Sequence, residues 1–69
     1  MSFHIQSIQD IKYFVEQHPE HPISTAWQDM LTDMNRFGEE WSFEGFVDEA
    51  EEQASDGNLS SYDLEQLFE

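Results

Sequence analysis

The second half of this chain combines charge of a single sign with the apolar spacing of helices. Residues 39–69 contain eleven acidic residues and neither lysine nor arginine. An acidic tail that stays disordered is poor in aromatic and aliphatic residues. This stretch instead contains Trp41, Phe43, Phe46, Val47, Ala50, Leu59, Tyr62, Leu64, Leu67 and Phe68. The sequence therefore predicts a folded chain that carries a formal net charge of −14.

A chain of 69 residues is expected to form one small domain, spanning residues 1–69. Such a chain buries only about 60% of its unfolded surface, and without cysteine it has no disulfide to stabilise it. Aromatic residues make up 14% of the sequence, which favours a real core because each buried ring removes about 150–250 Å² from water. Stability must come from apolar packing, from self-association or from a partner.

The sequence predicts a cytoplasmic protein, which would lie in the host cytoplasm if a phage encodes it. The chain opens with Met1 and shows no basic segment followed by an apolar run, so we expect a whole small gene product without a signal peptide. The absence of cysteine fits a reducing compartment. No apolar stretch approaches the ~20 residues of a membrane span, so no membrane partner is expected.

The spacing of apolar residues predicts an all-α fold, a small compact bundle of three to four short helices with a strongly acidic surface. A first helix is expected over residues 7–17, with Ile8, Ile11 and Val15 on one stripe. Ser7 is its expected N-cap, paired with Asp10 three residues later. The segment 18–22 contains two prolines and ends this helix.

A second helix is expected to begin after a Ser24 or Thr25 cap and to reach Phe37. Gly38 is its expected left-handed end residue, and Arg36 in the last turn suits the helix dipole. Its apolar stripe is Trp27, Met30, Leu31 and Met34.

The third helix shows the clearest pattern. It is expected to follow the N-cap Ser42 and to end at Gly57, with Trp41 packing on Phe46 and Gly45 leaving room for another backbone. Phe43, Phe46, Val47, Ala50 and Ala54 fall within one arc of about 100°.

A fourth helix is expected to begin near Ser60 or Ser61. Ser60 and Asp63 have the spacing of a capping box. The apolar contacts of this helix are expected from Tyr62, Leu64, Leu67 and Phe68.

The acidic residues are the candidate partner-binding residues. Acids four residues apart on a helix, such as Asp29 and Asp33 or Glu44 and Asp48, repel one another by a few tenths of a kcal/mol per pair. No base within residues 39–69 relieves this repulsion, so a compensating gain on binding is expected. The first choices are Glu44, Asp48, Glu49, Glu51 and Glu52. The next ring is Asp29, Asp33, Glu39, Glu40 and Asp56.

Such a surface predicts binding to a basic protein rather than to nucleic acid itself, which requires cationic contacts. Neighbouring carboxylates on a helix are ~5–6 Å apart at the Cβ atoms, similar to successive phosphates on a strand. In charge, size and helical patterning the chain resembles the DNA-mimic inhibitors of phages and mobile elements, such as antirestriction and anti-CRISPR proteins. The resemblance implies a protein that blocks the basic nucleic-acid-binding surface of a host defence or DNA/RNA-processing protein. No motif is shared, so no residue role is carried over.

Two other interpretations remain open. The acids could serve only solubility, since charged runs usually form solvated faces. The chain could also be an adaptor, antitoxin or transcription-regulator module that docks through exposed aromatic residues such as Trp41 or Phe68. A stripe of Trp27, Met30, Met34 and Phe37 is more typical of a core, although it could form a homodimer seam.

Metal and catalytic sites are disfavoured, and no cofactor is expected. Residues 56–63 resemble the second half of an EF-hand, but the first half has Ala54 where a ligand is required, and a simple turn explains the same residues. His18 and His21 are two ligands where zinc needs three or four, so a solvent-exposed turn is expected there. Without cysteine or a basic cluster in a pocket, the chain is not expected to be an enzyme.

Overall fold

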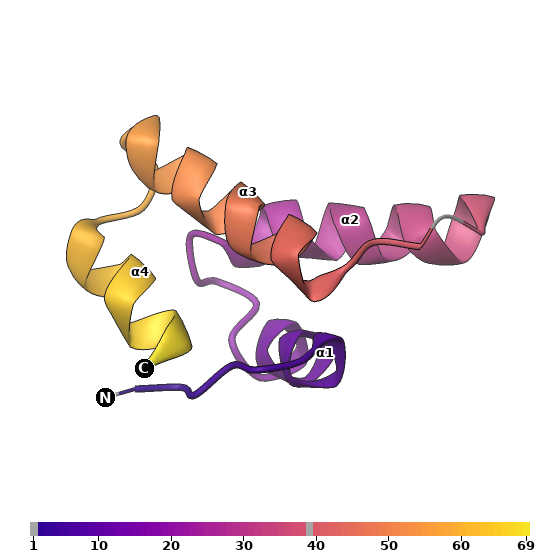
Figure 1. Ribbon diagram of the computed structural model, residues 1–69, viewed down its shortest axis with the longest axis horizontal. Helices are drawn as coiled ribbons and strands as arrows, with labels where there is room; N and C mark the ends of the chain where they lie inside the picture. Colours follow the sequence, from indigo (N-terminus) through magenta and orange to yellow (C-terminus); the bar gives the residue numbers. More distant parts are fainter. Residues whose placement is uncertain (1, 39) are drawn as a thin grey trace.

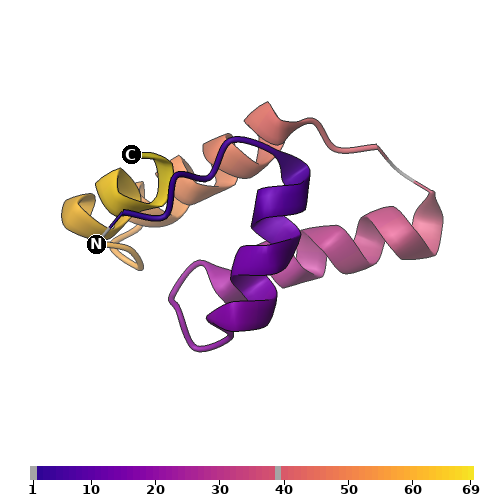
Figure 2. The same cartoon turned by 90° about the horizontal axis from the view of Figure 1, so that it is seen from below.

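Residues 2–38 and 40–69 are described by a computed structural model, and they form four helices. These are α1 (Ile8–Gln17), α2 (Ser24–Phe37), α3 (Phe43–Ser55) and α4 (Ser61–Phe68). Helix α1 runs across α2, and α3 lies along α2 (Figures 1 and 2). The Cα radius of gyration is 11.2 Å, close to the ~11 Å of a compact chain of this length. The predicted all-α bundle is confirmed.

Serine side chains begin three of the four helices. The hydroxyl oxygens of Ser7, Ser42 and Ser60 each accept a hydrogen bond from the backbone N–H three residues later. These contacts satisfy N–H groups that have no partner within the first helical turn. The predicted caps of α1, α3 and α4 are therefore confirmed.

Helix α2 begins differently from the prediction. Its N-cap is Ile23, without a side-chain cap, and Ser24 is fully buried inside the first turn. The Ser24 hydroxyl instead donates to the backbone carbonyl of His18 and so fixes the preceding turn. The predicted Ser24 or Thr25 cap is wrong because tertiary burial decides this boundary. At the other end, Gly38 has φ of 68°, as expected for the left-handed end residue.

Trp27 lies at the centre of the core. Its side chain is fully buried, and its ring meets the rings of Phe14, Phe46 and Phe68 edge-on at centroid distances of 5.7, 6.5 and 6.2 Å. Edge-to-face pairs of this kind add to the gain from burial. The buried apolar residues are Ile5, Ile11, Phe14, Val15, Ile23, Trp27, Met30, Phe46, Ala50, Leu59 and Leu67.

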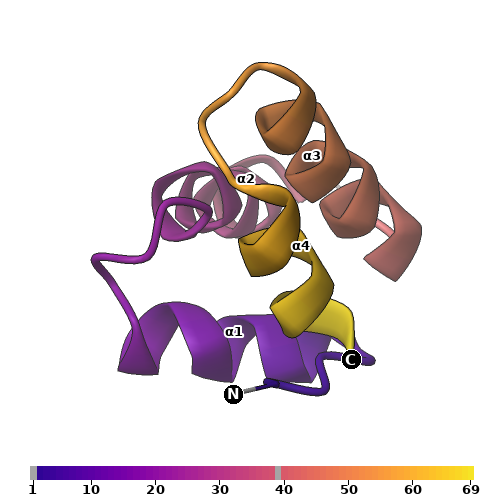
Figure 3. The same ribbon diagram turned by 90° about the vertical axis from the view of Figure 1, so that its left-hand side faces the viewer.

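The N-terminal segment, residues 2–6, lies along the end of α4. The N–H of Phe3 donates to the carbonyl of Gln66 at 2.8 Å, and the N–H of Ile5 donates to that of Leu67 at 3.0 Å. These two carbonyls belong to the last turn of α4, where no N–H group of the helix is available to donate to them. Figure 3 shows the N-terminal segment, in indigo, beside the C-terminal end of α4, in yellow. The segment therefore both ends α4 and contributes Ile5 to the core.

Two aromatic residues expected in apolar contacts lie in solvent. Tyr62 of α4 is 60% exposed, and Phe37 at the end of α2 is 63% exposed. The stripe that ends at Phe37, interpreted from the sequence as core or as a homodimer seam, is therefore only partly buried. Trp27 and Met30 are buried, Met34 is half-buried and Phe37 is exposed. The reason is that the last turn of α2 extends beyond the other helices (Figure 1).

Candidate partner-binding surface

Helix α3 presents four exposed carboxylates on one side, here called the acidic face. At 100° per residue, its members fall within an arc of about 100°. They are Glu44, Asp48, Glu51 and Glu52, and each is exposed. The opposite side of the helix carries Phe46 and Ala50, both fully buried. The periodicity that places apolar residues in the core therefore places these four acids outward.

The rest of the molecule holds α3 in a defined rotation about its axis. The indole N–H of Trp27 donates to the backbone carbonyl of Phe46 at 3.0 Å, a buried hydrogen bond between α2 and α3. An imposed rotation would break this bond and expose the Phe46 ring. Because burying an aromatic side chain is worth about 1.5–3 kcal/mol, the orientation of the acidic face is fixed by the core.

Both ends of α3 are closed by local hydrogen bonds. Ser42 caps the start, while the aromatic ring of Trp41 lies over Gly45, where an added Cβ would stand 3.2 Å from the ring. Gly45 thus makes room for Trp41 rather than for another backbone. At the end, the N–H of Asn58 donates to the carbonyl of Gln53 and that of Gly57 to Ala54. This is the Schellman arrangement, with φ of 84° at Gly57.

The EF-hand-like residues are accounted for by that helix end together with the Ser60 cap of α4. In residues 2–38 and 40–69, no three His, Cys, Asp or Glu side chains are grouped so that they could hold a metal ion. The turn interpretation of residues 56–60 agrees with the geometry.

Glu49 differs from the other first-choice acids. It is half-buried, and its carboxylate accepts a hydrogen bond from the side-chain amide of Gln53 at 2.8 Å. The Gln53 side-chain oxygen in turn accepts from the Asn58 amide at 3.0 Å. Glu49 is therefore tied into a local network that supports the end of α3, and it lies outside the acidic face.

The next ring of acids is distributed over other elements. Asp29 and Asp33 are exposed on α2, at one edge of the stripe that carries buried Trp27 and Met30. Glu40 and Asp56 are exposed in the segments that flank α3. Glu39 lies outside the described residues.

The two basic side chains belong to the first two helices. Lys12 is exposed on α1, and the Arg36 guanidinium lies over the Phe37 ring of α2 at 5.4 Å from its centroid. Neither residue is on α3 or α4. The acidic face is accordingly carried by a helix that has no basic residue of its own.

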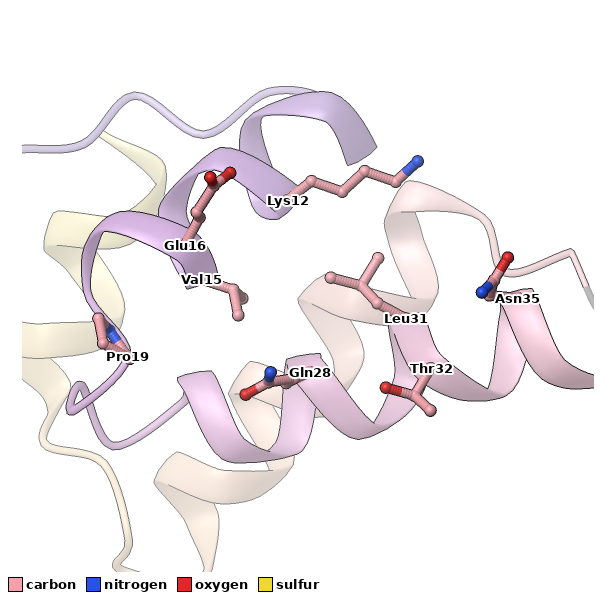
Figure 4. A pocket seen from close by; sticks show the side chains of 8 residues that line it. All are labelled: Lys12, Val15, Glu16, Pro19, Gln28, Leu31, Thr32 and Asn35. Atoms are coloured by element: carbon pink, nitrogen blue, oxygen red, sulfur yellow. The ribbon is translucent and has the colours of Figure 1, made fainter.

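A groove between α1 and α2, with a volume of about 480 Å³, shows a mixed character. Figure 4 shows Val15 and Leu31 approaching one another across it, with Lys12 and Asn35 toward one end and Pro19 toward the other. The apolar middle is flanked by Lys12, Glu16, Gln28 and Thr32. Because apolar, basic, acidic and amide side chains are mixed along this groove, its lining does not favour any one class of ligand.

A second groove, of about 460 Å³, borders α3 itself and is mainly apolar. Sequence patterns do not indicate this groove, because one of its walls is the N-terminal segment, and no local pattern predicts the position of that segment beside α4. This groove is lined by Ile5, Gln6, Phe43, Val47, Glu51, Leu64 and Phe68.

Within the turn of residues 18–22, His21 is more buried than expected, whereas the other four residues are exposed. His21 is half-buried with its ring 5.0 Å from that of Phe14, and its Nδ1 accepts a hydrogen bond from the N–H of Ile23 at 3.2 Å. The His18 ring meets the Phe3 ring edge-on and lies tilted against the Phe14 ring, each at a centroid distance of 5.1 Å. Burial lowers the pKa of His21 below its usual value; Asp63 opposes this shift and His18 adds to it. The prediction of a simple solvent-exposed turn is wrong for His21.

No protein-family model, characterised protein or solved structure matches this chain. Among the described residues, no helix combines the length and apolar character that crossing a membrane demands.

Proposed function

We propose that this protein is a non-enzymatic inhibitor whose acidic face imitates the phosphates of a nucleic-acid strand. It would occupy the basic nucleic-acid-binding surface of a host defence or DNA/RNA-processing protein, as antirestriction and anti-CRISPR inhibitors do. The observation that carries the proposal is the array of Glu44, Asp48, Glu51 and Glu52 on a helix whose other side is buried. Fixed carboxylates bind more tightly than those of a mobile chain, because less freedom is lost on binding.

The chemistry of the acidic face suits arginine and lysine. Neighbouring carboxylates are ~5–6 Å apart at the Cβ atoms, and each accepts hydrogen bonds from a guanidinium, often two at once. A net charge of −14 would steer the protein toward a basic surface and speed association at low salt. Binding would also relieve the repulsion between Glu44 and Asp48, which no base on α3 offsets.

Competition with nucleic acid tests this proposal. The purified protein is added to candidate basic proteins carrying labelled DNA or RNA, and release of the label is followed as salt is varied. Displacement that weakens steeply with salt is expected. Simultaneous binding of both ligands by the partner would contradict mimicry.

Charge reversal identifies the surface that acts. The variant D48K/E51K/E52K should need at least a tenfold higher concentration to displace the labelled nucleic acid, since it removes three of the four acids of the acidic face. The new lysines lie toward the C-terminal end of α3, where the helix dipole tolerates positive charge. The matched control E16K/E20K/E65K changes the net charge equally at exposed positions off α3. An equal loss of displacement by the control would mean that binding depends on the total charge of the protein rather than on the acidic face.

A second candidate function is favoured by exposed aromatic residues. Tyr13, Phe37 and Tyr62 are at least 60% exposed, and Trp41 is 37% exposed, so an adaptor that docks through aromatic contacts is chemically possible. Phe68, the other aromatic residue expected to dock, is half-buried against Trp27 and Phe43 and offers less free surface than these four residues. In that case Phe37→Ser would weaken binding more than charge reversal, and affinity would change little with salt.

A further inference from the structure

The apolar groove described above opens directly beside the acidic face. Its floor consists of half-buried apolar side chains from α3 and α4, together with buried Ile5. Its volume of about 460 Å³ lies within the range of sites that receive small ligands or side chains. The lining residues that matter below are Phe43, Val47, Glu51, Leu64 and Phe68.

The groove and the acidic face share one residue. Phe43, Val47 and Glu51 follow one another at intervals of four along α3, so they form a single stripe on the helix surface. Glu51 belongs to the acidic face and also lines the groove. A partner that pairs with Glu51 therefore reaches the edge of the groove.

We propose that this groove receives an apolar side chain of the partner protein, carried on a segment whose flanking residues are lysine or arginine. The proposal rests on the proposed function and names the chemistry that the partner must offer. The floor residues Phe43, Val47, Leu64 and Phe68 are apolar and suit an aliphatic or aromatic side chain. The carboxylate of Glu51 at the edge, with Asp48 next to it on α3, favours positive flanks.

This arrangement gives the surface a means of choosing among basic proteins. Carboxylates alone respond to charge and steer the encounter, and almost any cationic surface satisfies them. A single apolar anchor buried in a pocket commonly supplies much of the affinity in protein interfaces. Partner choice would then come from the groove, and speed of association from the acidic face.

A second copy of this chain fits the groove less well. It would bring another formal charge of −14 against the edge where Glu51 lies. Like charges placed opposite one another oppose association. Charge complementarity therefore favours a basic partner as the occupant.

Two short synthetic peptides test the proposal with the full-length protein. One is a lysine-rich peptide with a central leucine, and the other carries serine in place of leucine. The leucine peptide is expected to bind about tenfold or more tightly, which corresponds to burial of one aliphatic side chain. Its addition should shift the methyl NMR signals of Ile5, Val47 and Leu64, whereas the serine peptide should shift only amides of the acidic face.

Val47→Gln serves as the groove variant. Val47 is half-exposed and glutamine has the better helix propensity, so the fold should persist, and amide dispersion checks this. The variant should remove the difference between the two peptides and retain the affinity of the serine peptide. The methyl shifts of the unaltered protein test the proposal independently if the variant fails to fold.

Three results would overturn the groove assignment. The first is equal affinity of the two peptides with shifts confined to the acidic face, which would leave the proposed function intact. The second is failure of the leucine peptide to bind at all. The third is a shift of the groove methyls with protein concentration alone, which would show that a second copy covers the groove. Failure of the proposed function would appear elsewhere, as unimpaired displacement by D48K/E51K/E52K in the competition assay.

Discussion

The position of α3 against the core depends on a few side chains, of which Trp27 contributes most. Its indole joins rings from α1, α3 and α4, and its N–H reaches the Phe46 carbonyl of α3. The sequence places Trp27 on an apolar stripe but cannot show this hydrogen bond, because nineteen positions separate donor and acceptor. The role of the indole N–H is therefore visible only in three dimensions.

Trp27→Phe should lower the free energy of unfolding by about 2–4 kcal/mol, from a lost buried hydrogen bond and the space left by the smaller ring. Urea denaturation followed by circular dichroism measures the change. Trp41→Phe is the matched control, because Trp41 is 37% exposed, and a change below about 1 kcal/mol is expected there. Equal losses in both variants would contradict the central role given to Trp27.

His21 gives the fold a dependence on pH. Burial lowers its pKa below 6.5 in the folded state, so the unfolded chain takes up the proton first. The stability that neutral His21 contributes is fully present above about pH 6.5 and is lost as the pH falls below that value. Protonation also places a hydrogen on Nδ1, which then cannot accept the N–H of Ile23.

The melting temperature of the unaltered protein should therefore fall between pH 7.5 and 5.5 by more than that of His21→Asn, whose amide oxygen can accept the same bond without titrating. His4→Asn is the control, because His4 is exposed and asparagine tolerates its φ of 53°. An identical pH response in all three proteins would exclude His21 as the source.

At the scale of elements, the sequence predicts what is local and misses what depends on distant segments. The Ser7, Ser42 and Ser60 caps follow from residues three apart, and the acidic face follows from the period of α3. Ser24 also precedes an apolar helical stripe, yet it is buried and its hydroxyl donates to the His18 carbonyl.

The N-terminal segment is the largest element that sequence patterns could not place. It has no helical period, and its hydrogen-bond partners Gln66 and Leu67 lie at the other end of the chain. Because this segment forms one wall of the apolar groove, the groove was equally beyond sequence reasoning. Of the candidate site, the carboxylates could be predicted and the adjoining apolar surface could not.

Ile5→Ala should show that this segment is part of the fold. Ile5 is 3% exposed, so its truncation should cost about 2–4 kcal/mol of stability. Ile8→Ala provides the comparison, since Ile8 is half-buried at the start of α1 and should cost less. Chemical denaturation of both variants measures the difference, and an Ile5 effect as small as that of Ile8 would mean that the segment is readily detached.

At the scale of the whole molecule, sixteen acids and two bases must share a small surface. The extents of the molecule are 33 × 22 × 21 Å. At low salt the Debye length is about 30 Å, so most carboxylates lie within about one Debye length of one another. Unfolding separates these charges, and their mutual repulsion therefore destabilises the folded state. The core around Trp27 must offset this cost in the free protein.

Moderate salt should consequently raise the melting temperature of the free protein, because screening weakens the repulsion. The variant D48K/E51K/E52K should show a smaller rise, since each reversal changes the charge by two and the formal net charge goes from −14 to −8. The control E16K/E20K/E65K has the same net charge but leaves the acidic face intact. If repulsion is concentrated on the acidic face, the control should keep a steeper salt response than the α3 variant. If the melting temperatures of the two variants rise equally with salt, the repulsion depends on total charge rather than on the acidic face. If the melting temperature of the unaltered protein does not change with salt, the acids are too dispersed to repel one another measurably.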